Sequence, residues 1–107
     1  MTAGETSALT VCDQWAGRTA TVTVRGEIDA ATADAFHERL AAVAGGGPTR
    51  LVIDLAGVEF LDSAGLRAFV RLRKALPRDC PIILRSPHRR TRQVFDLTGL
   101  ATAFEFE

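Results

Sequence analysis

Hydrophobic and polar residues alternate along residues 18–26, where Ala20, Val22 and Val24 are separated by threonines and an arginine. This period of two predicts a β-strand with one buried side and one solvent-facing side. A strand that is buried on both sides would instead be a continuous apolar run. The pattern therefore predicts a sheet whose helices lie mainly on one face.

The rest of the chain alternates between short apolar runs and apolar residues at helical spacing. Further strands are expected at residues 8–14, 50–55, 81–85 and 102–106. Three helices are expected between them, each with start and stop signals. The first helix follows a cap at Asp29 or Thr32 and ends at the glycine-rich stretch 45–48. The second helix runs from about Ser63 to Pro77. The third helix has Ser86 as its cap, Pro87 at its first position and Gly99 after its end.

Apolar spacing also predicts which helical side chains are buried. The first helix should bury Phe36, Leu40 and Val43, because these residues share one helical face. In the third helix, Val94 and Leu97 are expected to face the core.

The order β-β-α-β-α-β-α-β predicts parallel strand pairing through right-handed crossovers. The expected fold is a single α/β domain with a mixed, mostly parallel sheet of about five strands. Residues 1–7 are small and polar and are expected to form a flexible leader, so the domain covers residues 8–107. Loops that follow parallel strands meet at the carboxyl edge of the sheet. Asp29, Ser63 and the segment 86–90 are therefore expected to line one surface.

Composition narrows the possible functions of these 107 residues. A formal net charge of zero argues against general nucleic-acid binding, which needs a basic excess. No apolar run approaches the roughly 18 residues of a membrane span, and the N-terminus lacks the pattern of a signal peptide. Cys12 and Cys80 have no metal-ligand spacing and are expected to be buried or half-buried thiols. We therefore expect a soluble cytoplasmic protein without cofactor or metal.

Ser63 is the residue with the most distinctive chemistry, and three interpretations compete for it. Serine is a preferred helix N-cap, and either Asp62 or Ser63 can fill that position. A phosphoserine there would be favoured by the helix N-terminus but opposed by Asp62. A nucleophilic serine lacks the G-x-S-x-G elbow, and only His37 or His88 would be available as its base.

Two other groups of charged residues have both structural and functional interpretations. Asp29 and Asp62 are expected near each other at strand ends, where capping, or help in placing Ser63, is favoured over acid–base or metal chemistry. The basic run 85–92 is typical of a solvated helix face, and its functional interpretation is a docking patch for an acidic partner.

Three stretches resemble the STAS-domain anti-sigma factor antagonists of bacteria. They are VRGEIDAATADAF, LVIDLAGVEFLDSAGL and VFDLTGL, in the order and spacing of that family. The likeness extends from about residue 8 to residue 107. It implies sequential strand order and helices largely on one face of the sheet.

The resemblance also implies a function. In this family the anti-sigma factor, itself a serine kinase, holds a sigma factor inactive, and the unphosphorylated antagonist binds the kinase and frees the sigma factor. The kinase phosphorylates the serine of D-S-x-G-L, which releases the antagonist, and a metal-dependent phosphatase of the PP2C type resets it. By residue match the acceptor is Ser63, and the partner-binding site comprises Asp29, Asp62, Ser63, Ala64 and Gly65. Ala64 departs from the family, many members of which have a second serine there.

The expected protein is therefore a regulatory monomer that binds an anti-sigma kinase and is not an enzyme. It is expected to bind neither nucleic acid nor membrane. Two alternatives are a STAS scaffold or transporter-associated subunit whose serine is not modified, and a small serine hydrolase that uses Ser63 and His88.

Overall fold

The structure is a computed structural model that describes residues 9–107, so the leader expected at residues 1–7 lies outside the described residues. The elements follow the predicted order: β1 (Leu9–Ala16), β2 (Thr19–Ile28), α1 (Ala33–Gly45), β3 (Arg50–Leu61), α2 (Ser63–Ala75), β4 (Ile82–Arg85), α3 (Arg89–Leu97), the short 3-10 helix η1 (Leu100–Ala103) and β5 (Glu105–Phe106). None of the helices in this part of the chain is both long and apolar enough to cross a membrane.

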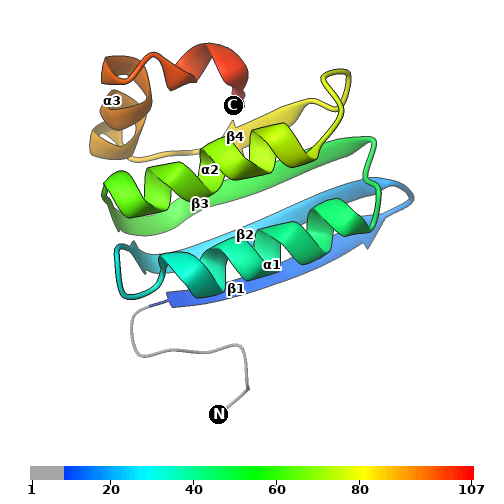
Figure 1. Cartoon of the computed structure of the whole chain (residues 1–107), viewed down its shortest axis with the longest axis horizontal. Coiled ribbons are helices and arrows are strands. Elements are labelled where there is room, and N and C mark those ends of the chain that lie inside the picture. The colour runs from blue at the N-terminus through cyan, green and yellow to red at the C-terminus, as the bar shows by residue number, and fades with distance from the viewer. Residues whose placement is uncertain (1–8) are drawn as a thin grey trace.

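The five strands form one sheet in the order β1-β2-β3-β4-β5. The first pair is antiparallel, and the remaining pairs are parallel because a helix or helical segment crosses over between them. Figure 1 shows α1 and α2 side by side over one face of the sheet, with α3 beyond α2 on the β4 side. The predicted α/β fold, with a mixed and mostly parallel sheet and helices mainly on one face, is confirmed.

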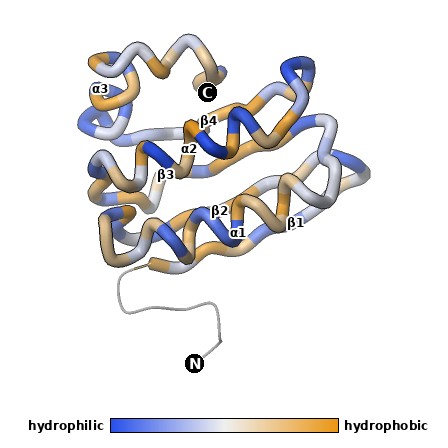
Figure 2. The backbone as a smooth tube through the Cα atoms, viewed as in Figure 1, coloured by the Kyte–Doolittle hydropathy of each residue, from blue (hydrophilic) through white to orange (hydrophobic). Residues whose placement is uncertain are grey.

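The core lies between this face and the helices. Ala20, Val22 and Val24 are fully buried, whereas the threonines between them are only partly covered. The predicted buried face of α1, made of Phe36, Leu40 and Val43, is likewise in the core. Figure 2 shows hydrophobic and hydrophilic positions alternating along both α1 and α2. Burial of one face of β2 and of α1 thus explains the periodicity of these two segments.

Phe69 of α2 lies at the centre of a cluster of buried aromatic rings. Its ring centroid is 5.3 Å from that of Phe36 and 5.2 Å from that of Phe95. Phe104 lies 6.2 Å away, with its ring nearly perpendicular to that of Phe69. These edge-to-face and tilted contacts are favourable ring geometries. The cluster therefore joins α1, α2, α3 and the segment before β5.

The start of α3 differs from the prediction. The helix begins at Arg89, with His88 as its N-cap residue, rather than after a Ser86 cap. Ser86 has a positive φ of 54°, and its N–H donates to the carbonyl oxygen of Glu107 at 2.9 Å. Ser86 therefore continues the pairing of the last two strands, and the helix starts later.

The buried face of α3 was predicted only in part. Val94 packs against the core as expected, but Leu97 is 87% exposed. The buried residues of the helix are Thr91 and Phe95. The prediction was wrong for Leu97 because Phe95 packs into the aromatic cluster. Leu97 follows two residues later, so its side chain lies on the opposite side of the helix and faces solvent.

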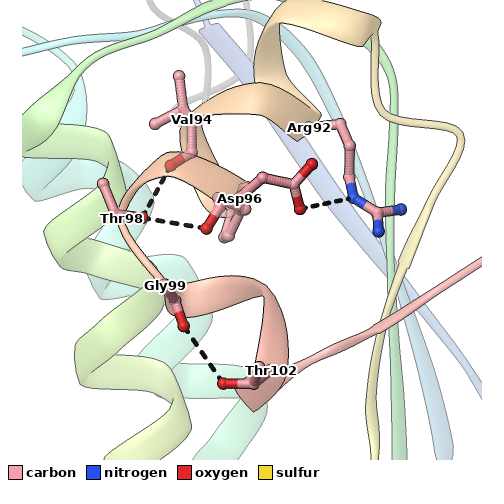
Figure 3. Close-up of polar contacts among 7 residues, drawn as sticks. Arg92, Val94, Asp96, Thr98, Gly99 and Thr102 are labelled. Carbon is pink, nitrogen blue, oxygen red and sulfur yellow. Dashed lines mark hydrogen bonds and ion pairs between the residues drawn. The ribbon is translucent and has the colours of Figure 1, made fainter.

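The end of α3 agrees with the prediction. Gly99 follows the C-cap residue in a left-handed conformation with φ 77°, which favours glycine. The Thr98 hydroxyl donates to the carbonyl oxygens of Val94 and Phe95 at 2.7 and 3.2 Å, and Thr102 donates to that of Gly99 at 3.2 Å (Figure 3). The Val94 carbonyl oxygen also accepts the backbone N–H of Thr98 at 3.2 Å, so the threonine hydroxyl adds to the hydrogen bonds that close the helix end.

The central strands are longer than predicted. β3 runs to Leu61 rather than stopping at residue 55, and it pairs with β2 up to Ile28. Two register shifts interrupt this pairing, and such irregularities break the clean alternation from which a strand is recognised. β4 pairs with β3 only as far as Asp54. The ends of β2 and β3 consequently project beyond β4 at the carboxyl edge.

The two cysteines have different surroundings, and neither forms a disulfide. Cys80 is buried, and burial raises the pKa of its thiol. Cys12 is exposed, so the prediction of a buried or half-buried thiol was wrong for that residue.

Candidate functional site

The carboxyl ends of β2 and β3 bring Asp29 and Asp62 together. Ile28 and Leu61 are register partners in these strands, and each aspartate is the next residue. The Asp62 N–H also donates to the carbonyl oxygen of Ile28 at 3.2 Å. The two turns are thus adjacent at one edge of the sheet, as the sequence predicts.

The segment 86–90 reaches this region indirectly. β4 stops well before the end of β3, and Nε2 of His88 lies 2.7 Å from the carbonyl oxygen of Ala56. α3 then runs beside the projecting end of β3, where Arg90 and the half-exposed Phe60 line a groove of about 210 Å³. The basic segment therefore adjoins the strand that leads to Ser63.

Asp29 closes the turn between β2 and α1. Its Oδ1 accepts hydrogen bonds from the backbone N–H groups of Ala31 and Thr32, at 2.9 and 3.1 Å, and from the Thr32 hydroxyl at 3.2 Å. Thr32 holds the N-cap position of α1, but its side chain makes no capping bond. Within residues 9–107 the second carboxylate oxygen of Asp29 has no hydrogen-bond partner, so it is available to another molecule.

Asp62, not Ser63, caps α2. Its Oδ1 accepts from the N–H groups of Ala64 and Gly65 at 2.9 and 3.2 Å. Ser63 is the first residue of the helix and is exposed. In the described structure its hydroxyl makes no hydrogen bond. The choice that the sequence leaves open between two caps therefore falls on Asp62, and the Ser63 hydroxyl has no structural role here.

Gly65 allows the start of α2 to lie directly against the ends of β2 and β3. A Cβ at this position would be 2.5 Å from Cδ1 of Leu61, 2.6 Å from Cγ2 of Ile28 and 2.8 Å from the carbonyl oxygen of Ile28. The backbone oxygen has little freedom to move. A glycine is thus required for the close approach that positions Ser63, which sequence reasoning from the residues alone does not reveal.

We expect Gly65→Ala to lower the free energy of unfolding by about 1–3 kcal/mol, because overpacking forces side chains and backbone apart. Urea denaturation followed by circular dichroism measures this change. Gly45→Ala is the matched control, since a Cβ at Gly45 meets nothing within 4 Å. Equal stability of the two variants would contradict the close packing inferred for Gly65.

The site has no catalytic constellation. Ser63 is not hydrogen-bonded to a histidine, and His88 is engaged by a backbone carbonyl. Asp29 and Asp62 each accept backbone N–H groups at the start of a helix. Across residues 9–107 no group of three or more His, Cys, Asp and Glu side chains is arranged to hold a metal ion. What the arrangement presents is an exposed hydroxyl at the start of α2, next to the Asp62 carboxylate and near the turn that holds Asp29.

A groove between α1 and α2 begins beside Ser63, and sequence reasoning missed it. It has a volume of about 230 Å³ and is lined by Ala30, Ala33, Asp34, His37, Ala64, Arg67, Ala68 and Arg71. The spacing of three and four residues on both helices is the signal from which a shared groove could have been recognised.

Known proteins with similar sequences and structures agree with the family resemblance noted in the sequence. Residues 11–105 match the family model described as "Mlab, STAS domain". The anti-sigma-F factor antagonist RsfB of Mycobacterium tuberculosis is 34% identical over 104 residues, which are 97% of this chain and 84% of that protein. The anti-sigma-B factor antagonist of Listeria monocytogenes is 36% identical over 85 residues, 78% of this chain and 75% of that protein. A crystal structure of an anti-sigma factor antagonist from Mycobacterium paratuberculosis superposes with a TM-score of 0.86 at 33% identity, covering 92% of this chain and 85% of that one.

Proposed function

Because the chain belongs to the STAS-domain family of anti-sigma factor antagonists, we propose that it works as a phosphorylation-controlled binding partner. Its unphosphorylated form binds an anti-sigma factor that is a serine kinase, and this binding frees the sigma factor. Phosphorylation of Ser63 by that kinase ends the binding, and a PP2C-type phosphatase restores it. The protein itself is a substrate and a ligand rather than an enzyme.

One observation carries this proposal: the Ser63 hydroxyl is exposed and free while Asp62 caps the helix. A serine that caps a helix is already engaged through its oxygen, whereas a kinase substrate needs an accessible hydroxyl. A phosphate on Ser63 would also leave the core untouched, because Leu66 and Phe69 on the same helix face the other way. The modification would change the surface without unfolding the domain.

The partner-binding surface is proposed to comprise Asp29, Asp62, Ser63, Ala64 and Gly65. The free oxygen of Asp29 can pair with a cation on the kinase. The small side chain of Ala64 leaves the surface low beside Ser63, so a partner can approach it closely. Gly65 is buried beneath this surface and contributes by letting α2 lie close to the strand ends. Phosphate at the centre of such a contact adds bulk, a desolvation cost and repulsion from the neighbouring carboxylates.

Intact-mass spectrometry of the purified protein, incubated with candidate anti-sigma kinases and ATP, tests the proposal. We expect wild type to gain one phosphate and Ser63→Ala to gain none. Ser86→Ala is the matched control, since Ser86 is another exposed serine in a loop after a strand, and it should be phosphorylated like wild type. Phosphorylation of Ser63→Ala would place the acceptor elsewhere.

A STAS scaffold whose serine is not modified is the alternative function. It predicts binding to a partner with or without ATP, and no phosphate on any variant. Absence of phosphate with every candidate kinase would therefore favour the scaffold.

A further inference from the structure

The groove between α1 and α2 is basic. Two guanidinium groups, those of Arg67 and Arg71, line it together with a single carboxylate, that of Asp34. Alanines form much of the rest of its lining, so little bulk separates these charges from a bound group. The groove is therefore suited to an anionic group of small size.

Within residues 9–107 neither arginine of this groove takes part in an ion pair. The ion pairs of the described structure involve Arg39, Arg50, Arg85 and Arg92, but neither groove arginine. His37 also lines the groove, and within residues 9–107 its buried Nδ1 has no hydrogen-bond partner. That nitrogen is covered by protein, so it is out of reach of a ligand in the groove. The side chains of Arg67 and Arg71 are exposed, so an anionic group of a partner can pair with them.

Arg67 lines this groove and is also close to Ser63 along the helix. It lies four residues after Ser63 on α2, and both side chains are exposed. Residues at this spacing are neighbours on a helix, with about 5–6 Å between their Cβ atoms, and an anion placed before a cation is the favourable order. A phosphate on Ser63 is consequently within reach of Arg67.

We propose that the α1–α2 groove accepts a carboxylate side chain of the anti-sigma partner, and that phosphoserine 63 withdraws Arg67 from it. This inference rests on the proposed function and adds a second cause of release. In the unphosphorylated protein, Arg67 and Arg71 face the partner's carboxylate. After phosphorylation, the phosphate dianion on Ser63 pairs with Arg67 within the same helix. The groove thereby loses one of its two cations, and the phosphate at the same time repels the partner's acidic group.

The intramolecular pair can be tested without any partner. Protein with phosphoserine incorporated at position 63 during translation is titrated by ³¹P NMR. We expect the second pKa of the phosphate to be higher by several tenths of a unit in Arg67→Gln than in the Arg67 protein, because removal of a neighbouring cation disfavours the dianion. Lys74→Gln is the matched control, a cation of the same helix that lies outside the groove, and it should leave that pKa unchanged.

The docking role is tested on the unphosphorylated protein with the kinase found by mass spectrometry. Arg67→Ala and Arg71→Ala should each weaken binding about tenfold, as expected for a charge pair at an interface, and Lys74→Ala should not. An unchanged phosphate pKa in Arg67→Gln, or full affinity of both arginine variants, would overturn the inference. Neither result would bear on phosphorylation of Ser63 itself, which the mass measurement decides separately.

Discussion

Ser63→Glu is expected to bind the anti-sigma partner at least about 100-fold more weakly than Ser63→Ala. A carboxylate at this position adds a negative charge next to Asp62 and near the turn of Asp29, at the first residue of α2. A loss of roughly 3 kcal/mol from repulsion and desolvation corresponds to this factor. Isothermal titration calorimetry with the purified kinase domain measures both affinities.

Ser63→Ala should bind as well as unphosphorylated wild type, and should keep doing so after incubation with ATP. Ser86→Glu is the matched control, because it adds the same charge at another exposed serine, and we expect it to retain near wild-type affinity. Both Ser63 variants should keep wild-type stability, since the Ser63 hydroxyl bonds to nothing in the described structure. Equal affinity of Ser63→Glu and Ser63→Ala would contradict the proposal that phosphorylation of Ser63 controls binding.

Phe69→Ala is expected to lower the free energy of unfolding by about 3–5 kcal/mol, the usual cost of truncating a buried aromatic residue. Phe69 is fully buried and touches the rings of Phe36, Phe95 and Phe104. Its loss would open a cavity between three helices rather than at the edge of one. The total free energy of unfolding of a small domain is only about 5–15 kcal/mol, so this substitution should remove a large share of the stability.

Urea denaturation of Phe69→Ala beside Leu97→Ala measures this difference. Leu97 is also an apolar helical residue, but it is 87% exposed, so its truncation should change stability by less than about 0.5 kcal/mol. A loss for Phe69→Ala as small as that for Leu97→Ala would mean that the aromatic cluster does not hold the helices on the sheet.

These two predictions concern separate parts of one helix. Ser63 stands on the exposed side of α2 at its first residue, whereas Phe69 lies on the buried side. A phosphate at one position can therefore change binding while the other keeps the helix in place. Gly65 connects the two roles, because its close contact with Ile28 and Leu61 determines how far Ser63 stands above the sheet.

The α/β class, the order of the elements and the buried faces of β2 and α1 could be predicted from the sequence alone. Each depends on a short-range pattern, in which a side chain's neighbours two, three or four residues away share its environment. The adjacency of Asp29 and Asp62 follows in the same way, because parallel strands end at one edge. Ser63 was predicted as the acceptor from its family resemblance, and that assignment stays a prediction.

Other features depend on contacts between residues far apart in the chain. The sequence permits either Asp62 or Ser63 as the cap, and the pairing of Asp62 with Ile28 decides for Asp62. Leu97 fits the helical pattern of α3, yet packing of Phe95 on Phe69 turns it outward.

The length of β3 and the groove beside Ser63 also depend on contacts between segments far apart in the chain. Continued pairing with β2, in spite of two register shifts, extends β3 beyond its apolar run, and the groove exists only because α1 lies beside α2. Periodicity within one segment thus determined which elements form and which side of most of them is buried. Packing between segments decided which of two neighbouring residues able to cap the helix is engaged, and left the hydroxyl of Ser63 free.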